Sequence, residues 1–133
     1  MRWLAVTLSV SAAVAVALTA CSKKQDIGAQ AAALEKTFPG LSAAVAAQAQ
    51  ASAEPATDEP KACVVAAFCA AKRNDYAPAV ILLRRSVRLP GLTPTQLMAV
   101  SDIRKSWMTD LSERASRGDQ TAKQALAAIS GAN

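Results

Sequence analysis

Alanine dominates this chain and limits the folds that it can adopt. Of the 133 residues 32 are alanine, and aromatic residues make up only 4%. Alanine is the best helix former, but its methyl group buries little apolar surface, so the composition favours helices around a thin core. No stretch alternates apolar and polar residues over the length of a strand. We therefore expect an all-α fold, either a small antiparallel helical bundle or a set of helix pairs.

The N-terminus has the features of a secretory signal. Arg2 supplies a positive charge, and the run from Trp3 to Leu18 contains no charged residue. A short basic region followed by an apolar stretch is typical of a signal peptide. A membrane-spanning helix is the alternative, because about 20 apolar residues cross a bilayer and this stretch is close to that length. The residues that follow favour the signal peptide.

Leu18-Thr19-Ala20-Cys21 resembles the lipobox of bacterial lipoproteins, in which a branched apolar residue and two small residues precede a cysteine. The resemblance implies that residues 1–20 are a signal peptide and that Cys21 receives a diacylglycerol through a thioether. It also implies that the new amino group is acylated, as with palmitate. Two or more acyl chains give stable anchoring. A chance cysteine at the end of an ordinary signal peptide is the alternative.

The lipoprotein resemblance also predicts a location. In lipoproteins of double-membrane bacteria, an aspartate after the lipidated cysteine favours retention at the inner membrane. Ser22 occupies that position here, so the resemblance favours export to the outer membrane. We expect a cell-envelope protein that is lipid-anchored and faces the periplasm. Lys23 and Lys24 lie beside the anchor, where a basic side chain near an anionic surface contributes about 1 kcal/mol. A solvated tether without a partner is the alternative for these two lysines.

Proline and acidic residues divide the remaining chain into two parts. Residues 21–60 form an alanine-rich, flexible tether with a helical segment and a proline-rich linker, Glu54 to Pro60. Alanine promotes a helix here, but that helix has little to bury. Residues 61–133 are expected to form a four-helix domain. Its helices are predicted at 62–72, at 76–88, from Pro94 to about Arg117, and after Asp119 towards Gly131.

The long third helix of this domain has the clearest local signals. Thr93 and Gln96 form a capping box, with Pro94 at the first helical position. Its apolar residues fall within one broad arc at about 100° per residue. Trp107, the largest of them, is the expected anchor of the core.

Part of the domain has a weak resemblance to a repeat family. Asn74-Asp75-Tyr76 and the later Pro90 are similar to the second half of a tetratricopeptide repeat, in which a G-D-Y turn precedes a helix closed by proline. Gly118-Asp119 repeats the turn 44 residues later, in a form similar to Sel1-like repeats. The resemblance implies a groove for a peptide or a partner helix. An unrelated four-helix bundle with the same turn chemistry is the alternative.

Cys63 and Cys69 remain after lipidation, and an exported protein can form disulfides. Six residues of regular helix separate two Cα atoms by about 9 Å, beyond the roughly 7 Å that a bridge allows. A disulfide between them therefore requires Cys63 to lie in the linker before the helix. Two buried thiols, or pairing with another chain, are the alternatives. Two thiols without histidine give no metal site.

The densest basic sequence falls within two consecutive helices. We expect anionic contacts at Lys72, Arg73, Arg84, Arg85 and Arg88. Lipid phosphates, an anionic glycopolymer or an acidic partner are the candidate ligands, and a solvated helix face is the alternative. Nucleic acid is not expected, because the aromatic side chains that stack on single strands are nearly absent.

The chain contains no histidine. This excludes Ser-His-Asp and Cys-His nucleophiles and c-type haem attachment, so we expect no catalysis and no cofactor. Two functional hypotheses remain. The first is a lipid-anchored helical module that binds another macromolecule, a protein partner, through the helices from Lys61 to Arg88 and the long helix. The second is a structural or envelope-maintenance lipoprotein whose basic face binds anionic lipid or cell-wall polymer.

Overall fold

The computed structural model describes residues 25–49 and 54–132, and the expectation of an all-α fold is confirmed there. The six helices of these residues are α1 (Ile27–Leu34), α2 (Leu41–Gln48), α3 (Pro60–Lys72), α4 (Tyr76–Arg88), α5 (Pro94–Ser116) and α6 (Gln120–Gly131). The predicted signal peptide, Cys21, Lys23 and Lys24 lie outside the described residues. No helix within the described ranges has both the length and the apolar character needed to cross a bilayer.

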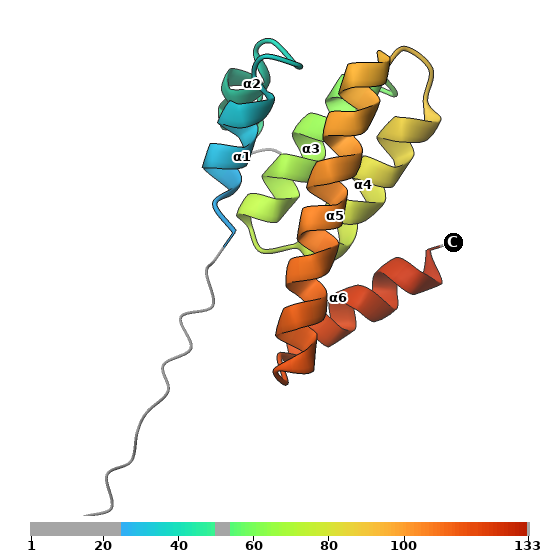
Figure 1. Cartoon of the computed structure of the whole chain (residues 1–133). Helices are drawn as coiled ribbons and strands as arrows, with labels where there is room; N and C mark the ends of the chain where they lie inside the picture. Colours follow the sequence, from blue (N-terminus) through green and yellow to red (C-terminus); the bar gives the residue numbers. More distant parts are fainter. Residues whose placement is uncertain (1–24, 50–53, 133) are drawn as a thin grey trace, which may run out of the picture.

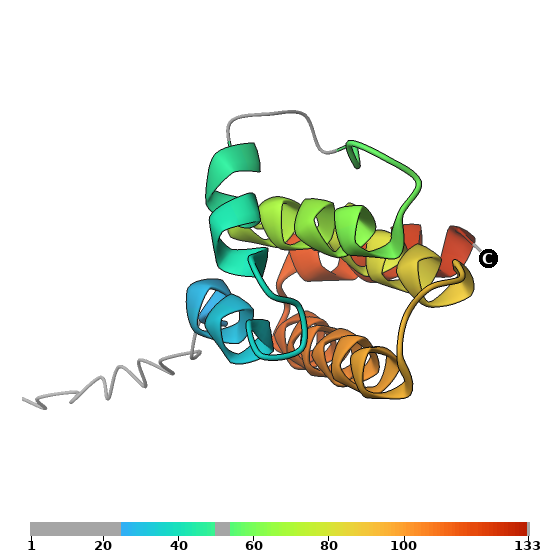
Figure 2. The ribbon, with the colours of Figure 1, turned by 90° about the horizontal axis from the view of Figure 1, so that it is seen from above.

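Three successive helices, α3, α4 and α5, run in alternating directions (Figure 1). The helices α1 and α2 pack on one side of this group, against α3. On the other side, α6 folds back to contact α4 and α5. The view from above shows α3 and α4 side by side, with α5 beneath them (Figure 2). This order places α3 in the interior of the fold.

The burial of α3 explains how an alanine-rich chain builds a core. Every residue from Cys63 to Ala71 in this helix is buried. Alanine side chains on the helix leave room for its neighbours to approach closely, so α1, α2 and α4 can all pack on α3. The small side chains therefore make α3 a helix that is apolar all round, as a helix surrounded by others must be.

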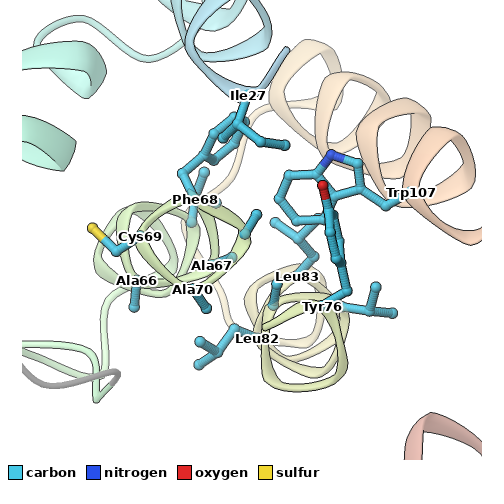
Figure 3. Close-up of a cluster of buried hydrophobic side chains, with 14 of the residues drawn as sticks. Ile27, Ala66, Ala67, Phe68, Cys69, Ala70, Tyr76, Leu82, Leu83 and Trp107 are labelled. Atoms are coloured by element: carbon cyan, nitrogen blue, oxygen red, sulfur yellow. The ribbon is translucent and has the colours of Figure 1, made fainter. Parts of the chain in front are cut away.

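Trp107 anchors the core, as the sequence predicts (Figure 3). Its indole ring meets Phe68 of α3 and Tyr76 of α4 edge to face, with ring centroids 5.3 and 6.0 Å apart. Such pairs contribute about 0.5–1.5 kcal/mol beyond area burial. The indole Nε1 donates a hydrogen bond to Gln30 Oε1 of α1 at 2.7 Å. One side chain thus connects four helices.

The prediction that residues 21–60 form a flexible tether with little to bury is wrong for residues 27–48. Phe38, Leu41 and Val45 are almost completely buried, and they belong to the same core as Phe68 and Trp107. Each of the two short helices has few large side chains, but together with the turn between them they place one apolar row on α3. Lys61 Nζ also donates to the Pro39 carbonyl at 2.6 Å, which ties the turn to α3.

The turn between α1 and α2 is closed by Glu35. Its carboxylate accepts hydrogen bonds from the backbone N–H groups of Ser42, at 3.0 Å, and Gly40, at 2.6 Å. These bonds hold the pKa of Glu35 below its ordinary value. Their contribution to stability is therefore present above the ordinary pKa of the carboxyl and is lost as the pH falls through the lowered one.

Side-chain caps begin α5 and α6, whereas Asp75, at the start of α4, makes no capping hydrogen bond. Thr93 Oγ1 accepts from Gln96 N–H, and the Gln96 side chain accepts from Thr93 N–H, which completes the predicted capping box. Asp119 accepts from Ala122 N–H at the start of α6. Gly118 has φ +96°, and Asn74, with φ 59°, takes a similar left-handed conformation in the α3–α4 turn. Asparagine tolerates this region better than most residues with a Cβ atom.

Replacing Phe38 by Ala should lower the free energy of unfolding by about 3–5 kcal/mol, because the loss of a buried ring would leave a cavity in the core. The measurement is urea unfolding followed by circular dichroism. Ala47→Ser, at an exposed position of α2, is the matched control and should change stability by less than about 0.5 kcal/mol. Equal stability of the two variants would show that α1 and α2 do not pack on the domain in solution.

Candidate functional site

The structure separates the five predicted anionic-contact residues into two groups. Lys72 ends α3 and Arg73 caps it, so both lie at the start of α4. Arg85 and Arg88 lie in the last turn of α4, and Arg84 lies just before them. The 13 residues of α4 span about 20 Å at 1.5 Å per residue. The five residues therefore do not form one cluster, because the length of α4 separates the two groups.

The arginines of α4 have different surroundings. Arg85 forms an ion pair with Asp58, which attaches the linker before α3 to α4. Arg84 Nη1 donates to the carbonyl of Ile129 in α6 at 3.2 Å. Arg88 is exposed. Arg84 also lines a pocket.

That pocket lies where α4, α5 and α6 meet, and we call it the α4–α5–α6 pocket. It has a volume of about 330 Å³ and is lined by Val80, Arg84, Arg104, Lys105, Met108 and Ile129. Three of the lining side chains are cationic and none is acidic. Arg104 and Lys105 were not among the predicted contact residues. The sequence signal for these two residues is an adjacent basic pair within one turn of Met108. This pair lines a pocket only because α6 folds back beside α5.

A second pocket lies between the first described residues and the α3–α4 turn. It has a volume of about 380 Å³, and its lining includes Gln25, Lys72 and Tyr76. Gln25 Nε2 donates to Ser106 Oγ of α5 at 3.3 Å. At 100° per residue, the Ser106 side chain points about 150° away from the mean direction of the Arg104, Lys105 and Met108 side chains around the axis of α5. Gln25, at the N-terminal end of the described residues, and the α4–α5–α6 pocket therefore lie on opposite faces of α5.

Cys63 and Cys69 are free thiols, and both are buried. Cys63 lies inside α3, so the condition for a disulfide between them is not met. Cys69 Sγ donates to the Val45 carbonyl of α2 at 3.5 Å. Burial raises the pKa of both thiols. Among residues 25–49 and 54–132, no three His, Cys, Asp or Glu side chains are grouped to hold a metal ion.

No family model, curated protein or solved structure matches the chain. The function is therefore inferred from the residues and their geometry.

Both internal thiols should react slowly with a thiol reagent in the native protein, because they are inaccessible and their raised pKa keeps them protonated. Titration with Ellman's reagent at mildly alkaline pH is the measurement. Rapid reaction should appear only after denaturant is added. Fast reaction of native protein would contradict the burial of α3, and absence of reaction in denaturant would indicate that the thiols are oxidised.

Proposed function

We propose that this protein is a lipid-anchored, non-catalytic binding module of the bacterial cell envelope. The lipobox resemblance at Leu18 to Cys21 supports the anchor. The α4–α5–α6 pocket supports the binding role, because several cationic side chains surround apolar ones there. Its place on the face of α5 opposite Gln25 is the observation that carries the proposal.

The short connection to the anchor favours one orientation of the domain. Gln25 follows Cys21 by four residues. Such a connection spans at most about 14 Å, because an extended chain covers no more than about 3.6 Å per residue. A lipid on Cys21 would therefore hold the Gln25 side of the domain near the bilayer. The α4–α5–α6 pocket would then face away from that bilayer, towards partners in the periplasm.

The binding face differs from the one expected along the helices from Lys61 to Arg88. The interior position of α3 removes most of that surface, since Cys63 to Ala71 are covered by the other helices. The face proposed here is instead formed by α4, α5 and α6.

The alternative function, contact with anionic lipid, is favoured by a separate observation. Lys72 is exposed and lines the pocket that also contains Gln25. An anchor on Cys21 would bring this lysine close to lipid head groups, together with Lys23 and Lys24. Contact between lysine and anionic lipid strengthens anchoring by about 1 kcal/mol per basic residue. The two functions use opposite faces of α5 and are therefore compatible.

Replacing Cys21 by Ala should abolish incorporation of labelled palmitate and cleavage after Ala20, because alanine has no thiol to form the thioether. Metabolic labelling and intact-protein mass measure these outcomes. Cys63→Ala is the matched control and should keep both the label and the processed mass. Labelling that persists in the Cys21→Ala protein would overturn the proposed anchor.

Fluorescent labels at two exposed lysine positions test the orientation. In the lipidated protein on vesicles, a label on Lys72→Cys should be quenched by a lipid-borne quencher more strongly than a label on Lys105→Cys. Lys72 lines the pocket beside Gln25, whereas Lys105 lines the α4–α5–α6 pocket. Equal quenching, or stronger quenching at position 105, would contradict the orientation. Quenching at position 72 that does not rise with the anionic lipid fraction would remove the lipid-contact function.

A further inference from the structure

The α4–α5–α6 pocket has an apolar floor contributed by three helices. Val80 of α4 and Ile129 of α6 are 1% and 5% exposed, and the half-buried Met108 of α5 lies beside them. A methionine adapts its shape to what it contacts, which suits a binding surface. Apolar side chains at the centre with charged ones around them form the usual anatomy of a protein interface.

The rim of this pocket carries positive charge that no lining residue offsets. Arg84, Arg104 and Lys105 line it without a carboxylate. Along α5, the exposed Asp102 lies three residues before Lys105, whereas Asp110 and Asp119 both pair with Arg114, at 3.5 and 2.9 Å. No ion pair between Arg104 or Lys105 and a carboxylate is found in the described ranges. The field at the pocket therefore attracts anions.

Part of the rim is already ordered. The hydrogen bond from Arg84 to the Ile129 carbonyl joins α4 to the C-terminal part of α6 across the pocket. This contact holds the floor and the rim in one arrangement before any ligand arrives. Pre-ordering lowers the entropic cost of binding.

We propose that the α4–α5–α6 pocket binds an acidic segment of a partner protein. One large apolar side chain of that segment rests on Val80, Met108 and Ile129, and neighbouring carboxylates pair with Arg104 and Lys105. The proposal rests on the assignment of this face as the binding face. Two observations favour a protein segment over a lipid. The pocket lies on the face of α5 opposite Ser106, which contacts Gln25, and the neighbouring Arg104 and Lys105 point about 100° apart around α5, which suits two separate carboxylates.

The volume is consistent with this occupant. About 330 Å³ lies at the lower end of the range for small-molecule sites, so it admits a large side chain rather than a whole lipid. Arginine forks match carboxylates in two-point contacts, and paired charges across an interface raise both specificity and the rate of association.

A selection of displayed random peptides against the full chain, purified from membranes in detergent, tests the proposal without a known partner. The recovered peptides should share a large apolar residue with acidic neighbours. They should bind Arg104→Glu/Lys105→Glu protein about ten-fold or more weakly, the change that 1.4 kcal/mol represents. Peptides without acidic enrichment, or with equal affinity for the double variant, would overturn the proposal.

Arg117→Glu/Lys123→Glu protein is the matched control. It makes the same change in net charge at exposed positions that do not line the pocket, so it should keep peptide affinity. Met108→Ala should weaken binding while leaving the salt dependence of binding unchanged, because it removes an apolar contact and no charge. Circular dichroism shows whether each variant is folded.

Competition with dodecyl phosphate distinguishes a lipid-like ligand. If this amphiphile binds the pocket more tightly than every recovered peptide, and Arg104→Glu/Lys105→Glu abolishes that binding, the protein-segment proposal is overturned. Failure of palmitate labelling at Cys21 would instead overturn the anchor and leave the peptide result intact. The two failures are therefore distinguishable.

Discussion

The packing of Trp107 is the interaction on which the rest of the structure depends. The ring lies between Phe68 and Tyr76 and its nitrogen reaches Gln30, so α1, α3, α4 and α5 share one contact point. In a chain with 4% aromatic residues, few other side chains are large enough to fill such a space. The position of α5 follows from this packing. Because α5 carries Arg104, Lys105 and Met108 on another face, the geometry of the pocket also depends on the indole.

Local signals were sufficient to predict the helices from Pro60 to Gly131. The Thr93–Gln96 capping box and the left-handed turn at Gly118 act within a few residues of each helix end, so they can be recognised without knowledge of the fold. The burial of Trp107 was predictable for a related reason, since it lies on the apolar arc of an amphipathic helix.

Features that depend on distant contacts were not predictable in this way. Phe38 and Leu41 are separated by a Pro-Gly turn, and only their packing on α3 shows that two alanine-rich helices share one apolar row. The basic residues of α3 and α4 are close in sequence but lie at different ends of an antiparallel pair. Arg84 and Arg104, by contrast, are 20 residues apart in sequence and line one pocket because α5 returns along α4.

Most helices contact the next helix in sequence, as α3 does with α4, α4 with α5 and α5 with α6. Topologies dominated by such nearby contacts fold in microseconds to milliseconds, because little chain entropy is lost before each contact forms. The contact between Arg84 and Ile129 spans 45 residues and needs α6 in place against α4. The pocket is thus complete only when the C-terminal helix has docked, so loss of that helix would remove the pocket floor and leave the aromatic cluster intact.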